Sequence, residues 1–154
     1  MLQLYIPLEY YIAAFRSLNC ARRGNACAPH KPVLLIAVML CVKDGLIQDR
    51  MIEPSYKLEE VFKIVWSKMV PMPSPWKSSF NLPFFHMDYE PFWTLMPSDY
   101  FVRLAEYSTN QLRRCFRGAM IHEDLFSYMK DAESRITLIQ TITDYYDLIP
   151  LEQV

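Results

Sequence analysis

A chain of 154 residues is long enough for one domain, and its 52% hydrophobic and 14% aromatic content can supply a real core. Its three glycines exclude a fibrous or low-complexity protein. The formal net charge of −1 identifies no partner, but the charges are unevenly placed: residues 11–43 hold arginines and lysines without any acid, Arg113, Arg114 and Arg117 lie close together, and acids dominate after Gly118. This asymmetry permits a polyanion partner, although ordinary solvated faces explain it equally well.

The cysteines and the N-terminus indicate the compartment. Cys20, Cys27, Cys41 and Cys115 do not have the spacing of a zinc site, and we expect them to be reduced and mostly buried. The N-terminus lacks the basic region of a signal peptide, and the apolar run 33–42 is too short to span a bilayer. We therefore expect a soluble, cytoplasmic protein with no membrane partner.

The first third of the chain predicts two helices. Apolar residues recur at helical spacing over 8–18, and Gly24 is well placed to end that helix. Pro32 suits the first turn of a second helix over 32–43. Because the run 33–42 is apolar on every side, this helix should be central and buried, with a strand as the competing interpretation.

The middle of the chain predicts a third helix and a hairpin. A short extended piece follows at 51–53, and Ser55 can cap a helix that ends before the prolines of 71–75. Aromatic and apolar residues then flank the turn-like sequence DYEP, which predicts an antiparallel β-hairpin with strands at 83–87 and 92–96.

The last third predicts three helices. Ser108 or the next residue can cap a helix that holds the arginine cluster and ends at Gly118, and two more helices follow at 123–130 and 134–148. Together these elements predict a single domain over residues 1–154. We expect a mostly helical α+β fold with a small antiparallel β-hairpin or sheet, compatible with a winged-helix-like arrangement.

The residues that could carry chemistry do not form a catalytic set. His30, His86 and His122 are far apart, and none belongs to a cluster with metal-ligand spacing. The isolated glycines exclude a phosphate-binding loop. We therefore expect no enzymatic activity, no bound metal and no cofactor.

Two polar residues stand at the start of the predicted buried helix. His30 and Lys31 directly precede Pro32, where the first unpaired N–H groups of a helix favour an anion. A lysine and a protonatable histidine at that point could form a seat for a phosphate. The simpler alternative is that His30 caps the helix and Lys31 is solvated.

The sequence LPFFHM holds a second candidate stretch. Pro83, Phe84 and Phe85 begin the predicted hairpin, and the alternation of a strand must bury one of the two phenylalanines. Ordinary core packing explains them, whereas His86 would stay exposed at the hairpin. A ligand role for this stretch is the alternative.

Three segments together carry a family resemblance. APHKPVLLIAVM at 28–39, LPFFHM at 82–87 and FWTLMP at 92–97 resemble, in order and spacing, the N-terminal recognition domain of bacterial HNH-type restriction endonucleases. That domain is related to the sulfur-binding domain of phosphorothioate-sensing restriction enzymes. The resemblance extends to IHEDLFSYMKDAESRITLIQTITDYY at 121–146 and covers residues 8–148.

The resemblance implies a DNA-recognition surface. His30 and Lys31 take the place of the family's basic pair, and Leu82, Pro83, Phe84 and His86 take the place of the stretch whose proline and apolar groups form a pocket for the phosphorothioate sulfur. This chain departs from that pattern, since Leu82 replaces a tyrosine, His86 replaces a small residue, and Lys31 stands in for an arginine and lacks its planar fork.

Two functions remain open at this stage. The first is a DNA-binding recognition domain of a restriction or phage-defence system, which contacts double-stranded DNA with a possible backbone modification through an electropositive face made of Arg22, Arg23, His30, Lys31 and the stretch 82–86. The family's HNH nuclease module would then lie in a missing domain or a partner. The second is a protein-interaction module or adaptor subunit of a defence complex on the same fold, which the net charge of −1 favours.

Overall fold

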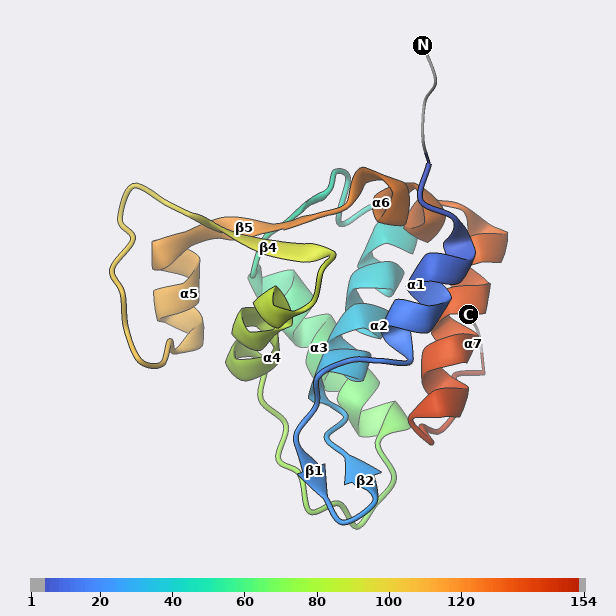
Figure 1. Cartoon of the computed structure of the whole chain (residues 1–154). Helices are drawn as coiled ribbons and strands as arrows, with labels where there is room; N and C mark the ends of the chain where they lie inside the picture. The colour runs from blue at the N-terminus through green and yellow to red at the C-terminus, as the bar shows by residue number, and fades with distance from the viewer. Residues whose placement is uncertain (1–4, 153–154) are drawn as a thin grey trace.

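The fold is built around one buried helix. The computed structural model describes residues 5–152, and its helix α2 (His30–Lys43) has no exposed surface from Val33 to Met39. A helix that is apolar on all sides is stable only inside the core. Figure 1 accordingly shows α2 in the middle of the helical layer. The predicted buried central helix is confirmed, and the competing strand is wrong.

Other helices pack around α2 and complete the core. It contacts α3 (Tyr56–Met69), α4 (Asn81–His86), α6 (Glu123–Lys130) and α7 (Ala132–Tyr145), and α7 also packs against α1 (Leu8–Phe15). One continuous hydrophobic cluster extends through all of them. A 3-10 turn over Met87–Tyr89 follows α4 directly.

Two small antiparallel sheets complete the structure. The strands are β1 (Arg22–Arg23) with β2 (Ala26–Cys27), and β3 (Met51–Ile52), β5 (Phe116–Ile121) and β4 (Trp93–Pro97) in that spatial order. Helix α5 (Thr109–Cys115) lies in the connection from β4 to β5, at one end of the molecule (Figure 1). The expected mostly helical α+β class is confirmed, and the winged-helix-like arrangement stays a prediction.

Helix starts that depend on local caps agree with the sequence. The Ser55 hydroxyl accepts the N–H of Leu58 at 3.0 Å, and α3 ends at Met69, ahead of the prolines. Helix α6 spans the predicted residues. Helix α7 begins two residues earlier than predicted, because Asp131 caps it by accepting the N–H of Ser134 at 3.0 Å.

The hairpin predicted over 83–96 is wrong in its first strand. Residues 81–86 form α4, and Phe80, Phe84 and Met87 are all buried with the spacing of one helix face. The second predicted strand exists as β4, but it pairs with β5 and not with residues 83–87. Helical packing against α2 therefore decides the conformation of the aromatic stretch.

The first helix is shorter than predicted. Helix α1 ends at Phe15, and Gly24 instead occupies the turn between β1 and β2 with a φ of 62°. A two-residue hairpin turn with positive φ at its first position is readily formed by glycine. The segment 16–21 therefore connects the helical layer to this small hairpin.

The predicted end of the arginine-bearing helix is also wrong. Ser108 caps α5 in a capping box with Gln111, as expected, but the helix ends at Cys115. Gly118 lies inside β5, the central strand, where a Cβ would be 2.6 Å from the carbonyl oxygen of Ile52. Glycine is required there by the close approach of β3 and β5.

The cysteines and the helix lengths can be compared with what the sequence predicted. All four cysteines are free thiols, with Cys41 and Cys115 buried and Cys20 and Cys27 half-buried. Within residues 5–152, no helix combines the length and apolar character needed to cross a bilayer.

Gly118→Ala should destabilise the fold. The added methyl group would clash with the backbone of β3, so the free energy of unfolding should fall by about 1–3 kcal/mol. Gly24→Asn is the control, because nothing lies within 4 Å of that position and asparagine tolerates positive φ. Urea denaturation of both variants measures the difference, and equal unfolding midpoints would contradict this account of β5.

Candidate functional site

A pocket forms where α2 begins. It has a volume of about 370 Å³ and lies between the start of α2, helix α4, the segment that leads into β1, and Trp76. Five of the eight predicted site residues line it: His30, Lys31, Leu82, Pro83 and His86. The remaining lining residues are Asn19, Cys20, Ala21, Ala28 and Trp76. The structure therefore brings the two separated sequence motifs together around one cavity with largely apolar walls.

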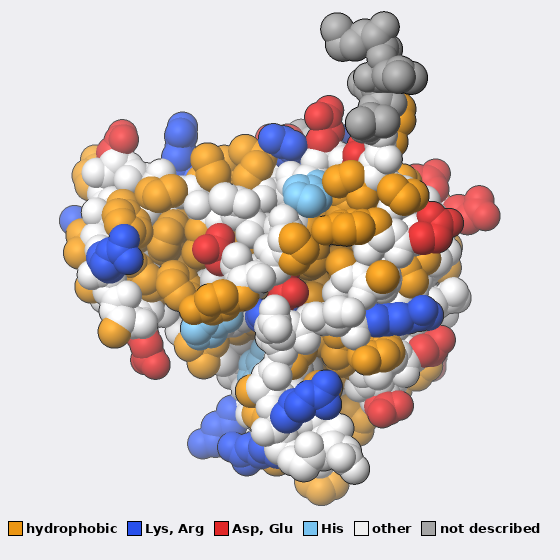
Figure 2. All heavy atoms as spheres, viewed as in Figure 1, with side chains coloured by type: hydrophobic (Ala, Val, Ile, Leu, Met, Phe, Trp, Pro, Cys, Tyr) orange, Lys and Arg blue, Asp and Glu red, His pale blue; other side chains and the backbone are white. Residues whose placement is uncertain are grey.

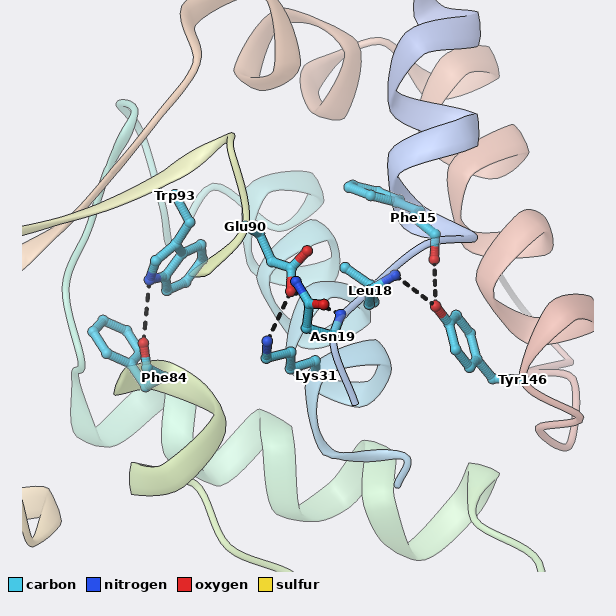
Figure 3. Close-up of polar contacts among 8 residues, drawn as sticks. All are labelled: Phe15, Leu18, Asn19, Lys31, Phe84, Glu90, Trp93 and Tyr146. Carbon is cyan, nitrogen blue, oxygen red and sulfur yellow. Dashed lines mark hydrogen bonds and ion pairs between the residues drawn. The ribbon is translucent and has the colours of Figure 1, made fainter. Parts of the chain in front are cut away.

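Lys31 does not extend into solvent. Its side chain is 7% exposed, and its Nζ donates to Oε2 of Glu90 at 2.8 Å; the Glu90 side chain is 3% exposed. The same Oε2 accepts the backbone N–H of Asn19 at 2.9 Å. Figure 3 shows the Glu90 carboxylate pointing toward both donors. The solvated Lys31 considered from the sequence is wrong, and its charge is balanced inside the protein.

The segment that carries Asn19 is held from the opposite side. The Tyr146 hydroxyl donates to the carbonyl of Phe15 at 2.6 Å and accepts the N–H of Leu18 at 3.3 Å (Figure 3). Burial raises the pKa of this hydroxyl, which therefore stays protonated. Helix α7 thus fixes the backbone that delivers Asn19 to Glu90.

His30 is half-buried and turned toward the loop after α3. Its Nε2 lies 2.7 Å from the carbonyl oxygen of Lys77, and its ring is 4.7 Å from that of Trp66. Helix α2 has Pro29 at its N-cap and no side-chain cap, so the expected capping role of His30 is wrong. Burial lowers the pKa of His30, which favours the neutral ring with Nε2–H as the donor.

Helix α4 divides its residues between the pocket and the core. Leu82 is 40% exposed at the pocket edge, whereas Pro83 is buried in its wall. Phe84 has no exposed surface, and its carbonyl accepts the indole N–H of Trp93 at 3.2 Å (Figure 3). Phe84 therefore anchors α4 and does not reach the pocket.

His86 is exposed at the pocket edge. Its ring lies parallel to that of Tyr89 with centroids 6.1 Å apart. Partial desolvation lowers its pKa, and the nearby positive charge of Lys31 lowers it further. At neutral pH His86 is thus a neutral ring that occupies part of the pocket mouth.

Arg22 and Arg23 provide the basic rim. Both are exposed on β1, and the Arg23 guanidinium lies 5.0 Å from the centre of the Trp76 ring, which itself lines the pocket. Figure 2 shows lysine and arginine side chains gathered over the end of the molecule that carries β1 and β2. The exposed cations near the pocket therefore come from the hairpin and from Lys77, which follows the pocket-lining Trp76, and not from the start of α2.

The second arginine cluster belongs to a different surface. Arg113 donates to Glu59 at 2.7 Å and stacks 3.8 Å from the centre of the Tyr56 ring. Arg114 and Arg117 line a separate depression that shares no residue with the first pocket. The basic residues of the sequence thus form two separate patches.

Three contributors to the pocket escape sequence reasoning. Glu90 lies in the turn-like DYEP sequence, 59 residues from Lys31, and no local pattern links the two. Trp76 follows a run of prolines that indicates only a loop, and Asn19 contributes a backbone N–H. A lone tryptophan beside Lys77 in a proline-rich loop is the one available signal, because aromatic and basic neighbours are typical of nucleic-acid contacts.

The pocket offers little reactive chemistry. Burial raises the pKa of the Cys20 thiol to about 11, so the thiol is neutral at physiological pH and a poor nucleophile. Among residues 5–152, no three His, Cys, Asp or Glu side chains are grouped so that they could hold a metal ion. The arrangement can exclude water, present apolar surface and receive an anion at a basic rim.

Comparison with known proteins places the fold. No protein-family model and no curated protein matches the sequence. The structure is similar to the sulfur-binding domain of ScoMcrA complexed with phosphorothioated DNA, with a TM-score of 0.67 and 14% identity over 93% of this chain and 91% of that one. It is also similar to the sulfur-binding domain of SprMcrA complexed with phosphorothioated DNA, with a TM-score of 0.64 and 15% identity over 92% and 86%. The resemblance found in the sequence is confirmed as a shared fold.

Stability should depend on pH through His30. Because its pKa is lowered in the folded state, the unfolded chain binds the proton more readily, and the free energy of unfolding should decrease as the pH falls below about 6.5. His30→Gln can retain a donor toward Lys77 and should show a smaller decrease between pH 7.5 and 5.5. Urea unfolding of both proteins across this range measures the slopes, and identical slopes would refute the assignment.

Proposed function

We propose that this chain is a DNA-recognition domain that holds the duplex backbone with a basic rim and reads a phosphorothioate-type modification in the adjoining pocket. The observation that carries the proposal is the convergence of His30, Lys31, Leu82, Pro83 and His86 on one largely apolar pocket beside Arg22 and Arg23. The two solved domains of the same fold, both complexed with phosphorothioated DNA, support it.

The chemistry of the pocket suits sulfur better than oxygen. A phosphate oxygen is strongly hydrated, and its transfer from water to an apolar wall is unfavourable unless donors replace the lost hydrogen bonds. Sulfur is larger and less strongly hydrated, so contact with Leu82, Pro83 and the Trp76 ring has a smaller desolvation cost. The pocket can therefore distinguish the two atoms even though both linkages are anionic.

The two kinds of site residue have different tasks in this proposal. Arg22 and Arg23 contact phosphates and position the duplex, whereas Leu82, Pro83 and His86 contact the modified linkage. His30 and Lys31 form part of the pocket lining, and Phe84 anchors α4 behind it. The domain has a recognition role without catalysis, and cleavage would require an HNH nuclease module in the same chain or in a partner.

Removal of a rim arginine should weaken binding to every duplex. Arg22→Ala and Arg23→Ala should each lower affinity for plain and modified DNA alike and reduce the slope of log affinity against log salt by about one. Lys43→Ala is the control, because Lys43 lies at the far end of α2, about 20 Å from the pocket. Fluorescence anisotropy at two salt concentrations decides, and an unchanged slope in both arginine variants would exclude the rim as the phosphate contact.

A change in the pocket wall should instead alter discrimination. Leu82→Asn replaces a 40% exposed apolar side chain by an amide of similar size. The preference for phosphorothioate over plain duplex should fall about three- to tenfold, with little change for plain DNA. Anisotropy with paired plain, methylated and phosphorothioate duplexes measures the ratio. A parallel loss for all duplexes would argue against a reading role for this wall.

The protein-interaction alternative keeps one supporting observation, the formal net charge of −1, since most free-standing DNA-binding domains are basic. The same anisotropy experiment separates the two functions. Equal, negligible binding to plain, methylated and phosphorothioate duplexes at low salt would leave protein interaction as the better account.

A further inference from the structure

The ion pair between Lys31 and Glu90 has no explanation in packing alone. Both side chains are withdrawn from water; Lys31 lines the pocket, and Glu90, which contacts it at 2.8 Å, lies behind the lining. The loss of hydration of two buried charges can outweigh their attraction, so an apolar pair of similar volume would serve stability equally well. The position of this pair, with Lys31 in the lining of the pocket, points to a role in what the pocket accepts.

Glu90 balances the charge of Lys31 and accepts one of the three N–H donors of its ammonium. Its Oε2 accepts both the Lys31 ammonium and the Asn19 N–H, and Tyr146 fixes the segment that delivers Asn19. Cys20 is a neutral thiol and the pKa of His86 is lowered, so neither adds charge to the pocket at neutral pH, and the charges of Arg22 and Glu106 nearby are opposite in sign. The pocket is therefore close to electrically neutral, although a lysine lines it.

A near-neutral pocket has a definite preference among backbone linkages. An ordinary phosphodiester needs strong, charged donors to replace the water it loses, and the charge of the ammonium that could supply them is already balanced by Glu90. A linkage in which one oxygen is replaced by sulfur or by a methyl group has a smaller desolvation cost on the substituted side. Such a linkage does not depend on a free cation in the pocket.

We propose that Glu90 is a positioning residue that sets the specificity of this pocket: by engaging Lys31 it excludes plain phosphate and admits apolar-substituted backbone linkages as a class, methylphosphonate as well as phosphorothioate. The inference rests on the proposed DNA-recognition function and goes beyond it in the class of ligand. It also assigns the selectivity to a residue outside the α4 stretch.

The native chain tests the charge argument directly. Three sets of mixed-sequence duplexes, identical except for one central linkage that is plain phosphate, phosphorothioate or methylphosphonate, are compared by fluorescence anisotropy. The methylphosphonate duplex should bind at least as tightly as the plain duplex, although it has lost a negative charge. Weaker binding than plain DNA would show that a cation drives recognition, and it would overturn the inference.

Glu90→Gln tests the residue itself. Release of Lys31 should tighten binding to plain duplex about tenfold relative to phosphorothioate duplex, and it should steepen the salt dependence for plain DNA by about one charge. Glu90→Asp keeps the carboxylate and should keep discrimination. A merely structural role predicts instead an equal loss for all duplexes, which would overturn the inference.

A double variant without either charge distinguishes an effect on ligand preference from an effect on folding. Lys31→Met combined with Glu90→Gln removes both charges, so the pocket should stay neutral and the native preference should return. Circular dichroism verifies that each variant is folded. If the Glu90→Gln variant does not fold, the comparison of methylphosphonate with plain duplex on the native chain tests the inference instead. Failure of the double variant to restore the preference would overturn the inference alone, whereas no binding of any duplex to the native chain would refute the proposed function and the inference with it.

Discussion

The burial of α2 on all sides is the constraint from which the rest of the structure follows. A helix with no solvent-facing stripe must be enclosed, and α3, α4, α6 and α7 contact it directly. The surrounding helices cover the first turn of α2 less completely. The segment before this turn comes from the exposed β1–β2 hairpin and not from another core element. The pocket lies at this turn. The polar residues His30 and Lys31 therefore line this pocket because of where α2 begins.

The buried ion pair connects the three chain segments that make the pocket. Lys31 comes from α2, Glu90 from the turn after α4, and Asn19 from the segment before β1. Removal of one partner from such a pair leaves an uncompensated charge, at a typical cost of about 3–5 kcal/mol. The pair therefore holds the three segments in register, and it does so without offering free charge to the pocket. The stability of the fold and the proposed ligand preference would depend on the same contact.

The elements that the sequence predicted correctly are those with local causes. The buried α2, the Ser55 cap of α3 and the acidic start of α6 each depend on residues within one or two turns. The errors arise where distant pairing decides. Whether the aromatic stretch at 83–87 becomes a strand depends on a partner strand, and its packing against α2 made it helical instead. Likewise β5 forms because β3 and β4, distant in sequence, flank it.

The residues around the pocket were likewise predicted in part, and the errors again concern contacts between distant segments. The resemblance paired His30 and Lys31 with the stretch 82–86, and the pocket unites five of these positions. The sequence could not show that Lys31 is already engaged, because its partner Glu90 follows 59 residues later inside a segment that indicates only a turn. Nor could it show that Phe84 faces the core, since that depends on the helical phase of α4. The resemblance indicated which residues would meet, but tertiary contacts decide which of their charges are free.

The net charge is consistent with the separate roles proposed for the basic rim and the apolar pocket. A strongly basic domain binds all DNA, and its residence on unmodified sites competes with recognition of rare modified ones. This chain carries a formal charge of −1, has few exposed cations near the pocket, namely Arg22, Arg23 and Lys77, and balances the charge of the lysine that lines the pocket. In the proposed function, each feature weakens the phosphate contacts that are common to all DNA sequences, so that the apolar contact supplies the larger fraction of the binding free energy. A reader that must license cleavage only at modified linkages gains selectivity from this weakness, because its occupancy of plain DNA stays low.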